Sequence, residues 1–238
     1  MSRIAAILPA AGLGTRMGAE KPKQFLELDG APLVLFTLRR LAACEEISSF
    51  IVATLAEEVA GLERIFSRER LGRPVRVVSG GGTRQESVAR GLAEAPGDTE
   101  IVLVHDAVRP LVRREQVQRV IAEARGRGAA ILGIPAIDTV KEVKRASLPE
   151  DVALVTATVP RERIVLAQTP QAFHAQLLRE AFAKAQRDGV TGSDEASLVE
   201  RFGHEVFVVL GSERNLKITR PADMELARFY WEMERHGK

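Results

Sequence analysis

The densest chemical signal in the sequence follows its first apolar run, where small residues lead into a group of cations. Residues 9–18 read Pro-Ala-Ala-Gly-Leu-Gly-Thr-Arg-Met-Gly, and Arg16, Lys21 and Lys23 fall within eight residues. Small residues let backbone N–H groups approach a ligand closely, and such a nest suits phosphate oxygens. Three cations beside the nest favour a polyphosphate ligand over the alternative, a basic surface turn.

Neither of the two common phosphate-binding loops accounts for this segment. A dinucleotide fingerprint would require glycine at position 17, where Met17 stands, and no acidic residue closes a second strand at the expected distance. A P-loop would require the pattern G-x-x-x-x-G-K-[ST], which does not occur. The loop therefore indicates a polyphosphate site of another kind.

A second glycine-rich stretch, Gly80-Gly81-Gly82, leads from an apolar run into a predicted helix that begins Thr-Arg-Gln-Glu-Ser. Three consecutive glycines cost conformational entropy, so a tight turn or a function must account for them. Ser87, in the first turns of that helix, is expected to face back toward the sheet edge. A plain strand-to-helix turn is the alternative.

The third feature is the segment Val-His-Asp-Ala-Val-Arg-Pro over residues 104–110. Asp106 ends an apolar strand at its carboxyl edge, where doubly wound folds bind ligands. A carboxylate there can hold Mg²⁺ or a sugar hydroxyl, and Arg109 can receive a phosphate. His105 points to the opposite face from Asp106, so we interpret it as a hydrogen-bonded structural histidine and not as a base.

Two later segments carry further polar candidates. Ser193, Asp194 and Glu195 begin a predicted helix, where they are either its N-cap and acidic first turn or part of a site. Lys217 lies between apolar neighbours on a strand-like piece, so its side chain either extends to solvent or meets an anion.

The elements that would position these residues alternate along the chain. Short β-branched runs predict strands, amphipathic segments with apolar residues three and four apart predict helices, and the alternation predicts a mostly parallel sheet covered on both faces. The predicted strands are 4–8, 50–54, 75–79, 101–105, 129–134 and 205–211, and the predicted helices are 32–44, 57–67, 83–95, 114–128, 175–188, 194–202 and one beginning at Pro221.

The alternation breaks after Pro135. Residues 138–168 hold strand-like pieces and no convincing helix, and they are not polar enough to form a solvated linker. We expect a β-arm at about 137–168 that projects from the sheet. Because such an arm has no core of its own, its apolar face would be buried against a second subunit.

Length and composition exclude several classes of protein. The chain has 238 residues, is 45% hydrophobic and carries a formal net charge of +2, which predicts one globular domain over 1–238 and no nucleic-acid binding through a bulk positive field. Cys44 is the only cysteine, so no intrachain disulfide exists and a buried apolar role is expected. The first apolar run is too short to span a membrane and does not resemble a signal peptide, so we expect a cytoplasmic protein without a membrane partner.

Seven motifs in order along the chain carry a resemblance to a known family. They are PAAGLGTRM with KPKQF, GGGTRQESV, VHDAVRP, DTVK, TPQAF, SDEASLVE and NLKITRP. The first is shared with nucleotide-sugar pyrophosphorylases, but together they resemble the 2-C-methyl-D-erythritol 4-phosphate cytidylyltransferases of the non-mevalonate isoprenoid pathway. The resemblance implies a Rossmann-like α/β fold, a homodimer formed through the β-arm, a requirement for CTP and Mg²⁺, and release of pyrophosphate.

The resemblance also implies roles for individual residues. Arg16 and Lys23 match residues that stabilise the transition state, and Arg161 matches an arginine that reaches the neighbouring subunit's site. Gly82 stands where relatives often carry an acid, and Arg163 is an alternative to Arg161. The implied nucleotide-binding positions are Ala10, Ala11, Gly12, Gly14, Gly81, Gly82 and Ser87. Those on the methylerythritol phosphate side are Asp106, Ala107, Arg109, Thr139, Thr169, Ser193 and Lys217. Of these, Lys217 is also implied to be catalytic, and Asp106 is also a candidate metal ligand.

The implied reaction explains a site rich in cations that has no obvious catalytic histidine. The phosphate monoester of the acceptor is already an anionic nucleophile near neutral pH and attacks the α-phosphorus of CTP in line, so the protein must hold two repelling anions together. A ribitol-5-phosphate cytidylyltransferase would share the nucleotide half and differ in the arm and acceptor pocket. A non-catalytic nucleotide-binding protein would need the nest but neither Arg16 nor Lys23.

Overall fold

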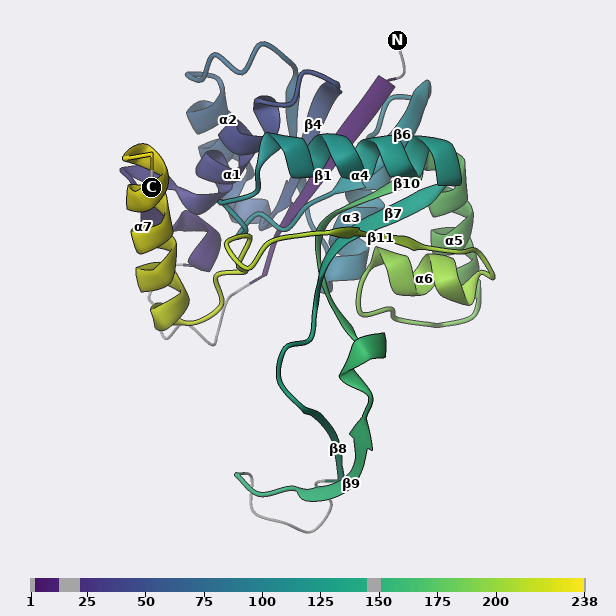
Figure 1. The fold of residues 1–238 in the computed structure, drawn as a ribbon. Coiled ribbons are helices and arrows are strands. Elements are labelled where there is room, and N and C mark those ends of the chain that lie inside the picture. Colours follow the sequence, from purple (N-terminus) through teal and green to yellow (C-terminus); the bar gives the residue numbers. More distant parts are fainter. Residues whose placement is uncertain (1–2, 13–21, 145–150, 238) are drawn as a thin grey trace.

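A seven-stranded sheet forms the centre of the computed structural model, which describes residues 3–12, 22–144 and 151–237 (Figure 1). Its strand order is β11-β7-β10-β6-β1-β4-β5, and all neighbours run parallel except those that involve β10. The strands are β1 (Arg3–Ala10), β4 (Ile47–Thr54), β5 (Val75–Ser79), β6 (Thr99–Val104), β7 (Ala129–Pro135), β10 (Val165–His174) and β11 (Phe207–Leu210). The predicted α/β class with a mostly parallel sheet is confirmed.

Helices cover both faces of this sheet because the side chains of β1 alternate between two apolar clusters. Ile4, Ala6 and Leu8 pack with α1 (Leu33–Ala42), α2 (Val59–Phe66) and α4 (Arg114–Arg127). Ala5 and Ile7 pack on the other face with α3 (Arg84–Ala93), α5 (Ala175–Arg187) and α6 (Glu195–Arg201). The observed helices lie within one to three residues of their predicted ends at most boundaries, and Cys44 is buried as expected.

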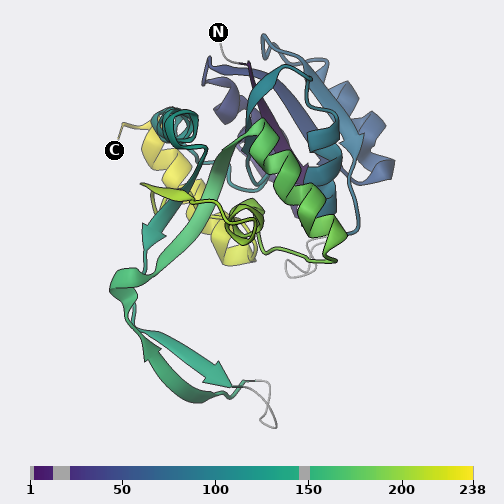
Figure 2. The same ribbon diagram turned by 90° about the vertical axis from the view of Figure 1, so that its right-hand side faces the viewer.

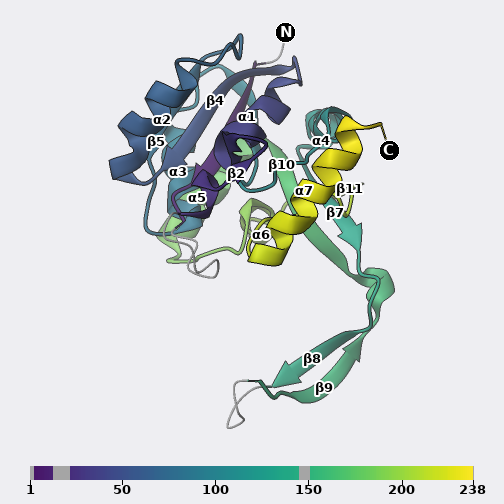
Figure 3. The ribbon, with the colours of Figure 1, turned by 90° about the vertical axis from the view of Figure 1, so that its left-hand side faces the viewer.

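The C-terminal helix α7 (Pro221–Arg235, yellow in Figure 3) packs outside the first layer. Met224 and Ala227 lie in a third apolar cluster with Leu33 of α1. Trp231 of α7 meets Phe36 of α1 edge to face, with ring centroids 4.9 Å apart. In the described part of the chain, no helix is long and apolar enough to cross a membrane.

The predicted arm consists of a two-stranded antiparallel sheet, β8 (Val140–Lys144) and β9 (Leu154–Val159), which stands away from the body in Figures 1, 2 and 3. Its apolar side chains are open to solvent: Leu154 is 61% exposed and Val155 53%. A short 3-10 turn (Arg161–Arg163) joins β9 to β10. The described residues of the arm therefore form no apolar core within the protomer.

One part of the prediction for the arm differs from the structure. The sequence predicts that residues 164–168 end the arm, but β10 continues to His174 and lies antiparallel between β6 and β7 in the main sheet. The physical reason is that β10 completes its hydrogen bonding with strands distant in sequence, which local composition does not indicate. As a result, the motif TPQAF (169–173) runs through the sheet and past the site described next.

Shorter elements complete the structure. A 3-10 turn (Lys23–Phe25) and the small strands β2 (Glu27–Leu28) and β3 (Ala31–Pro32) connect β1 to α1, and a second 3-10 turn (Ala56–Glu58) precedes α2.

Candidate active site

A small pocket of about 160 Å³ opens at the carboxyl edge of the sheet. Five segments converge on it: the end of β1, the turn at Lys23, the glycine loop between β5 and α3, the loop after β6, and the segment before α7. Its lining residues are Pro9, Ala10, Ala11, Gly12, Lys23, Gln24, Gly81, Gly82, Thr83, Arg84, Ser87, Asp106, Ala107, Val108 and Lys217. The structure thus brings together ten of the site residues predicted from the motifs.

The glycine loop reaches the end of β1 because Gly80 has no side chain. A Cβ atom at this position would lie 2.5 Å from Cβ of Ala11 and 2.8 Å from Oγ of Ser87, closer than packed atoms allow. The Ser87 hydroxyl accepts the Gly81 N–H at 3.1 Å and donates to the Thr83 carbonyl at 2.9 Å. Ser87 is therefore buried in the pocket wall and organises the loop, while its predicted role in nucleotide binding stays a prediction.

The backbone N–H groups of the loop are partly satisfied by α3 itself. The Glu86 carboxylate accepts from Gly82 N at 2.7 Å and from Thr83 N at 3.3 Å, while the Thr83 hydroxyl accepts the Glu86 N–H in a capping box. An acidic group consequently lies beside Gly82 although that position carries no side chain.

Lys23 lies at the pocket edge on a segment that is fixed by its neighbour Gln24. The Gln24 side chain is 2% exposed and donates to the Ala10 carbonyl at 2.7 Å. This bond fastens the turn to the end of β1, so Lys23 and the small residues of the first loop line the same pocket. The sequence analysis did not single out Gln24, because a buried glutamine has no local signature.

Asp106 is the electrostatic centre of the pocket. Its Oδ1 lies 3.3 Å from Nε of Arg84, and its Oδ2 lies 3.2 Å from Nε of Arg109 and 3.0 Å from Nζ of Lys217. Burial opposes ionisation of Asp106, but the three cations outweigh it and hold the pKa of the carboxyl well below its usual range. Lys217 therefore meets an anion, which decides between the two interpretations of this residue.

Arg84 was not predicted as a site residue, whereas Glu195 was considered together with Ser193 and Asp194 as part of either a helix start or a site. Nη1 of Arg84 lies 2.6 Å and 2.8 Å from the two oxygens of Glu195, which is only 1% exposed. The ion pair raises the pKa of Arg84 despite the opposing effect of burial, and burial raises the pKa of Glu195. Both residues lie in motifs that the sequence analysis quoted, but their pairing joins positions 111 residues apart.

His105 is buried behind the pocket and is fully hydrogen-bonded. Thr169 Oγ1 accepts the Asp106 N–H at 3.0 Å and lies 3.1 Å from Nδ1 of His105, whose Nε2 lies 3.1 Å from the Arg109 carbonyl. Burial lowers the pKa of His105 to about 4, so the ring is neutral near pH 7. This is the structural role that the sequence predicted.

The same buried layer fixes the segment that carries Lys217. Asn215 is completely buried; its amide donates to the Thr169 carbonyl at 2.8 Å, and its own carbonyl accepts from Nη1 of Arg109 at 2.7 Å. Arg109 is thus held between Asp106 and this backbone, and the Thr169 hydroxyl is used within the protein. Their predicted contacts with substrate remain predictions.

The remaining predicted residues lie away from the pocket or outside the described residues. Ser193 is exposed before α6, whose N-cap is Asp194, while Thr139 and Arg161 are exposed at the base of the arm. Arg161 donates to the Ile137 carbonyl at 2.6 Å. Gly14 and Arg16 lie outside the described residues.

Among the described residues, no group of three or more His, Cys, Asp or Glu side chains is arranged to hold a metal ion. Both oxygens of Asp106 face cations, which suits a hydroxyl donor better than a metal cation. This arrangement is compatible with Mg²⁺ that would be held mainly by the phosphate oxygens of a nucleotide, as is usual for nucleotide substrates.

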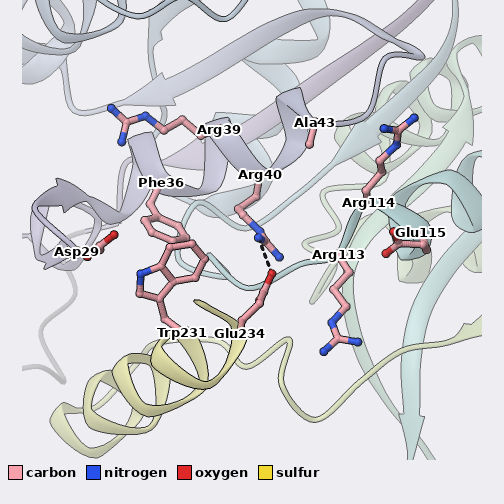
Figure 4. Close-up of a pocket in the computed structure, with 10 residues that line it drawn as sticks. All are labelled: Asp29, Phe36, Arg39, Arg40, Ala43, Arg113, Arg114, Glu115, Trp231 and Glu234. Atoms are coloured by element: carbon pink, nitrogen blue, oxygen red, sulfur yellow. Dashed lines mark ion pairs between the residues drawn. The ribbon is translucent and has the colours of Figure 1, made fainter. Parts of the chain in front are cut away.

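A larger cavity of about 650 Å³ lies between α1, the start of α4 and α7 (Figure 4). None of the predicted site residues lines it. Three of its arginines face carboxylates: Arg40 and Glu234 are 2.8 Å apart, while Arg39 and Arg114 pair with residues outside its lining. Its charges are largely balanced within the protein.

Comparisons with known proteins agree along the whole chain. A family model described as 2-C-methyl-D-erythritol 4-phosphate cytidylyltransferase (IspD) matches residues 4–233. Proteins of that name from Acidobacterium capsulatum and Solibacter usitatus are 52% and 48% identical to it, with coverage of 96% of this chain and 97% and 95% of theirs.

Solved structures agree as well. The crystal structure of 2-C-methyl-D-erythritol 4-phosphate cytidylyltransferase from Thermus thermophilus is 38% identical with a TM-score of 0.76, covering 97% of this chain and 98% of that one. The 4-diphosphocytidyl-2C-methyl-D-erythritol synthase of Anaerococcus prevotii gives a TM-score of 0.83 at 29% identity, covering 97% and 99%.

Proposed function

The chain belongs to the 2-C-methyl-D-erythritol 4-phosphate cytidylyltransferase family, and from this premise we propose how its own residues carry out the reaction. The enzyme transfers CMP from CTP to 2-C-methyl-D-erythritol 4-phosphate, giving 4-diphosphocytidyl-2-C-methyl-D-erythritol and pyrophosphate. The family match over residues 4–233 carries this assignment. It does not favour a ribitol-5-phosphate enzyme or a non-catalytic nucleotide-binding protein.

Direct attack by the acceptor phosphate on the α-phosphorus of CTP needs no protein base. The monoester is anionic near neutral pH, and its attack forms a new P–O bond while the bond to pyrophosphate breaks. The neutral, fully hydrogen-bonded His105 supports this view, because the histidine nearest the pocket is not placed to accept a proton from substrate. The barrier is instead the repulsion between two anions, which positioned cations reduce.

Lys23 and the small residues of the first loop form the nucleotide side of this mechanism. Lys23 lines the pocket beside Ala10 to Gly12, where its positive charge can stabilise the charge that develops on the triphosphate. Ser87 and the loop Gly80–Gly82 present backbone groups at close range, which suits recognition of the edge of a cytosine base. Arg16 is assigned a second charge-stabilising role on the family match alone.

Asp106 and Lys217 form the acceptor side. The ionised Asp106 carboxylate can accept hydroxyl groups of the methylerythritol chain, while Lys217 is 36% exposed and close enough to the pocket to bind the acceptor phosphate. Arg109 keeps this pair in place and adds to the local positive charge. Mg²⁺ bound to the triphosphate would neutralise the charge of the leaving pyrophosphate.

The arm supports assembly as a homodimer. Its exposed apolar residues need a partner surface, and a second copy of the chain supplies one that is self-complementary by two-fold symmetry. Thr139 and Arg161 lie on the arm and not at the pocket of their own protomer. We therefore assign them to the partner's site.

The function is tested by measuring pyrophosphate release from CTP with purified enzyme and three additions: methylerythritol phosphate, ribitol 5-phosphate or no acceptor. Turnover with methylerythritol phosphate only is expected. Preference for ribitol 5-phosphate would replace the assignment of the acceptor, and binding of CTP without turnover of either acceptor would refute an enzymatic function.

The shared site is tested by mixing Lys23→Ala and Arg161→Ala chains after denaturation and refolding. Each parent should be nearly inactive, because every site in it lacks one cation. A mixed dimer would contain one intact site and one doubly altered site, so random pairing should restore about a quarter of wild-type activity. No recovery despite verified subunit exchange would contradict the shared site, and Arg163→Ala in place of Arg161→Ala tests the neighbouring arginine.

A further inference from the structure

Glu195 is a buried carboxylate that does not line the pocket and has no role in the mechanism above. It is 1% exposed and lies in the first turn of α6. Acidic side chains are almost never buried to this extent without a specific partner. Helix capping does not explain it, because the Asp194 side chain already accepts the Ser197 N–H as the N-cap.

The partner of Glu195 is Arg84, which connects it to the pocket. Nη1 of Arg84 contacts both oxygens of Glu195, and Nε of the same guanidinium lies 3.3 Å from Oδ1 of Asp106. Because a guanidinium is planar and rigid, holding one edge of it fixes the direction of the other. The position of the Asp106 carboxylate is thus coupled to a residue on a different element, behind the pocket wall.

The charges in this chain explain why a second carboxylate is needed. Three cations, Arg84, Arg109 and Lys217, surround Asp106. Glu195 balances much of the charge of Arg84 on the side of the guanidinium that faces away from Asp106. The contact between Arg84 Nε and Asp106 Oδ1 is the longest of the three that Asp106 makes with cations. Without that charge, Arg84 would be drawn to Asp106, and Oδ1 would be less available to a substrate hydroxyl.

We propose that Glu195 is a positioning residue for the acceptor, which holds Arg84 so that Asp106 remains available to the hydroxyl groups of methylerythritol phosphate. This inference rests on the proposed function and deepens it. Glu195 acts through Arg84 and touches no substrate. We expect the effect to fall mainly on the acceptor, because the carboxylate that Arg84 contacts in the pocket is Asp106, on the acceptor side.

The proposal can be tested by substitution because other residues, and not Glu195, anchor the start of α6. The Gln171 side chain donates to Oδ2 of Asp194 at 2.7 Å and accepts the Ala196 N–H at 3.1 Å. These bonds fasten the start of the helix to β10. Glu195→Gln preserves the size of the side chain and removes only the charge, so the helix is expected to stay in place.

The experiment compares steady-state kinetics of wild type, Glu195→Gln and the matched control Glu200→Gln, an exposed position on the same helix. For Glu195→Gln we expect a KM for methylerythritol phosphate that is about tenfold higher, as for loss of a charge-assisted hydrogen bond, with a KM for CTP within about twofold of wild type. The control should match wild type. An unchanged KM for the acceptor, or an equal rise in both KM values, would overturn the proposal.

A double-mutant cycle tests whether the effect passes through Arg84. Arg84→Gln should raise the acceptor KM, and adding Glu195→Gln to it should cause little further change, because the group that Glu195 positions is already absent. Additive effects would contradict this route. If Glu195→Gln does not fold, Glu195→Asp, which keeps the charge on a shorter side chain, takes its place, and an unchanged acceptor KM again overturns the proposal.

The same data separate this proposal from the proposed function. Wild-type enzyme without turnover would refute the assigned reaction and this role together. Active wild type with an unaltered Glu195→Gln variant would refute only the positioning role.

Discussion

Acidification should destabilise this protein through protonation of His105, at a higher pH than the range in which most carboxylates titrate. The imidazole is completely buried, and burial lowers its pKa from 6.5 to about 4. In the unfolded chain the ring binds a proton near its ordinary pKa, whereas in the folded protein it stays neutral until about pH 4. The stability that His105 contributes is therefore fully present above pH 6.5 and is lost as the pH falls toward 4.

The magnitude follows from the gap between the two pKa values. It corresponds to about 3 kcal/mol of unfolding free energy over the whole window, of which about 2 kcal/mol is lost between pH 7 and pH 5. Asp106 has a lowered pKa, so its contribution is lost only at lower pH, below the ordinary carboxyl range. Burial raises the pKa of Glu195, so a falling pH changes the free energy of unfolding through Glu195 in the opposite sense, toward greater stability. That effect is the same in all the proteins compared below.

The assay is urea unfolding at pH 5, 6 and 7 for wild type, His105→Gln and the control His236→Gln at an exposed position. Wild type and control should lose about 2 kcal/mol of unfolding free energy from pH 7 to 5. His105→Gln should be less stable at pH 7, because the contacts with Thr169 and Arg109 are altered, but should show little of this pH dependence. If the variant retains the full wild-type pH dependence, another group is responsible and the reasoning about His105 is wrong.

Two further predictions concern catalysis. Lys23→Ala should lower kcat by about 10²–10³-fold with a smaller effect on the KM for CTP, as for loss of a preorganised cation. A normal kcat with a raised KM would leave Lys23 only a role in ground-state binding. The control is Lys184→Ala, at a partly exposed position of α5 that does not line the pocket. Gly80→Ala should raise the KM for CTP by about tenfold or more, because the new methyl group would force the loop away from Ala11 and Ser87. The control Gly97→Ala places its methyl group in open space and should match wild type. Equal kinetics for the two variants would show that the close approach of the loop is not needed.

The elements of the sheet could largely be predicted from the sequence because their apolar periodicity is local. Each strand and helix of the alternating part carries its own pattern, and the chemistry-bearing loops follow directly from the carboxyl ends of the strands. This is why Ser87 and Asp106 could be expected at the same edge of the sheet from the sequence. It is also why His105 could be assigned to the opposite side of its strand from Asp106.

The parts that could not be predicted depend on partners distant in the chain. Nothing local to β10 indicates that it lies antiparallel between β6 and β7, and nothing local to Arg84 or Glu195 indicates that they pair. The sequence likewise left Lys217 with two interpretations, since the carboxylate that it meets lies in the loop after β6, more than a hundred residues earlier in the chain. Long-range pairs of this kind decide the electrostatics of the pocket.

The pairing of strands β7 and β10 determines how freely the length and shape of the arm can change. They form one long antiparallel pair that begins within the main sheet. The last backbone-to-backbone hydrogen bond of the described residues before the arm joins Ala136 N to the Ile164 carbonyl at 3.0 Å. The arm is thus the far end of a hairpin, attached where the two strands β7 and β10 already pair. Lengthening, shortening or reshaping it changes loop closure by a small free energy and leaves the pairing in the sheet intact. The arm can therefore change in length and shape without altering the strand pairing of the body, provided that the residues assigned to the partner's site keep their place.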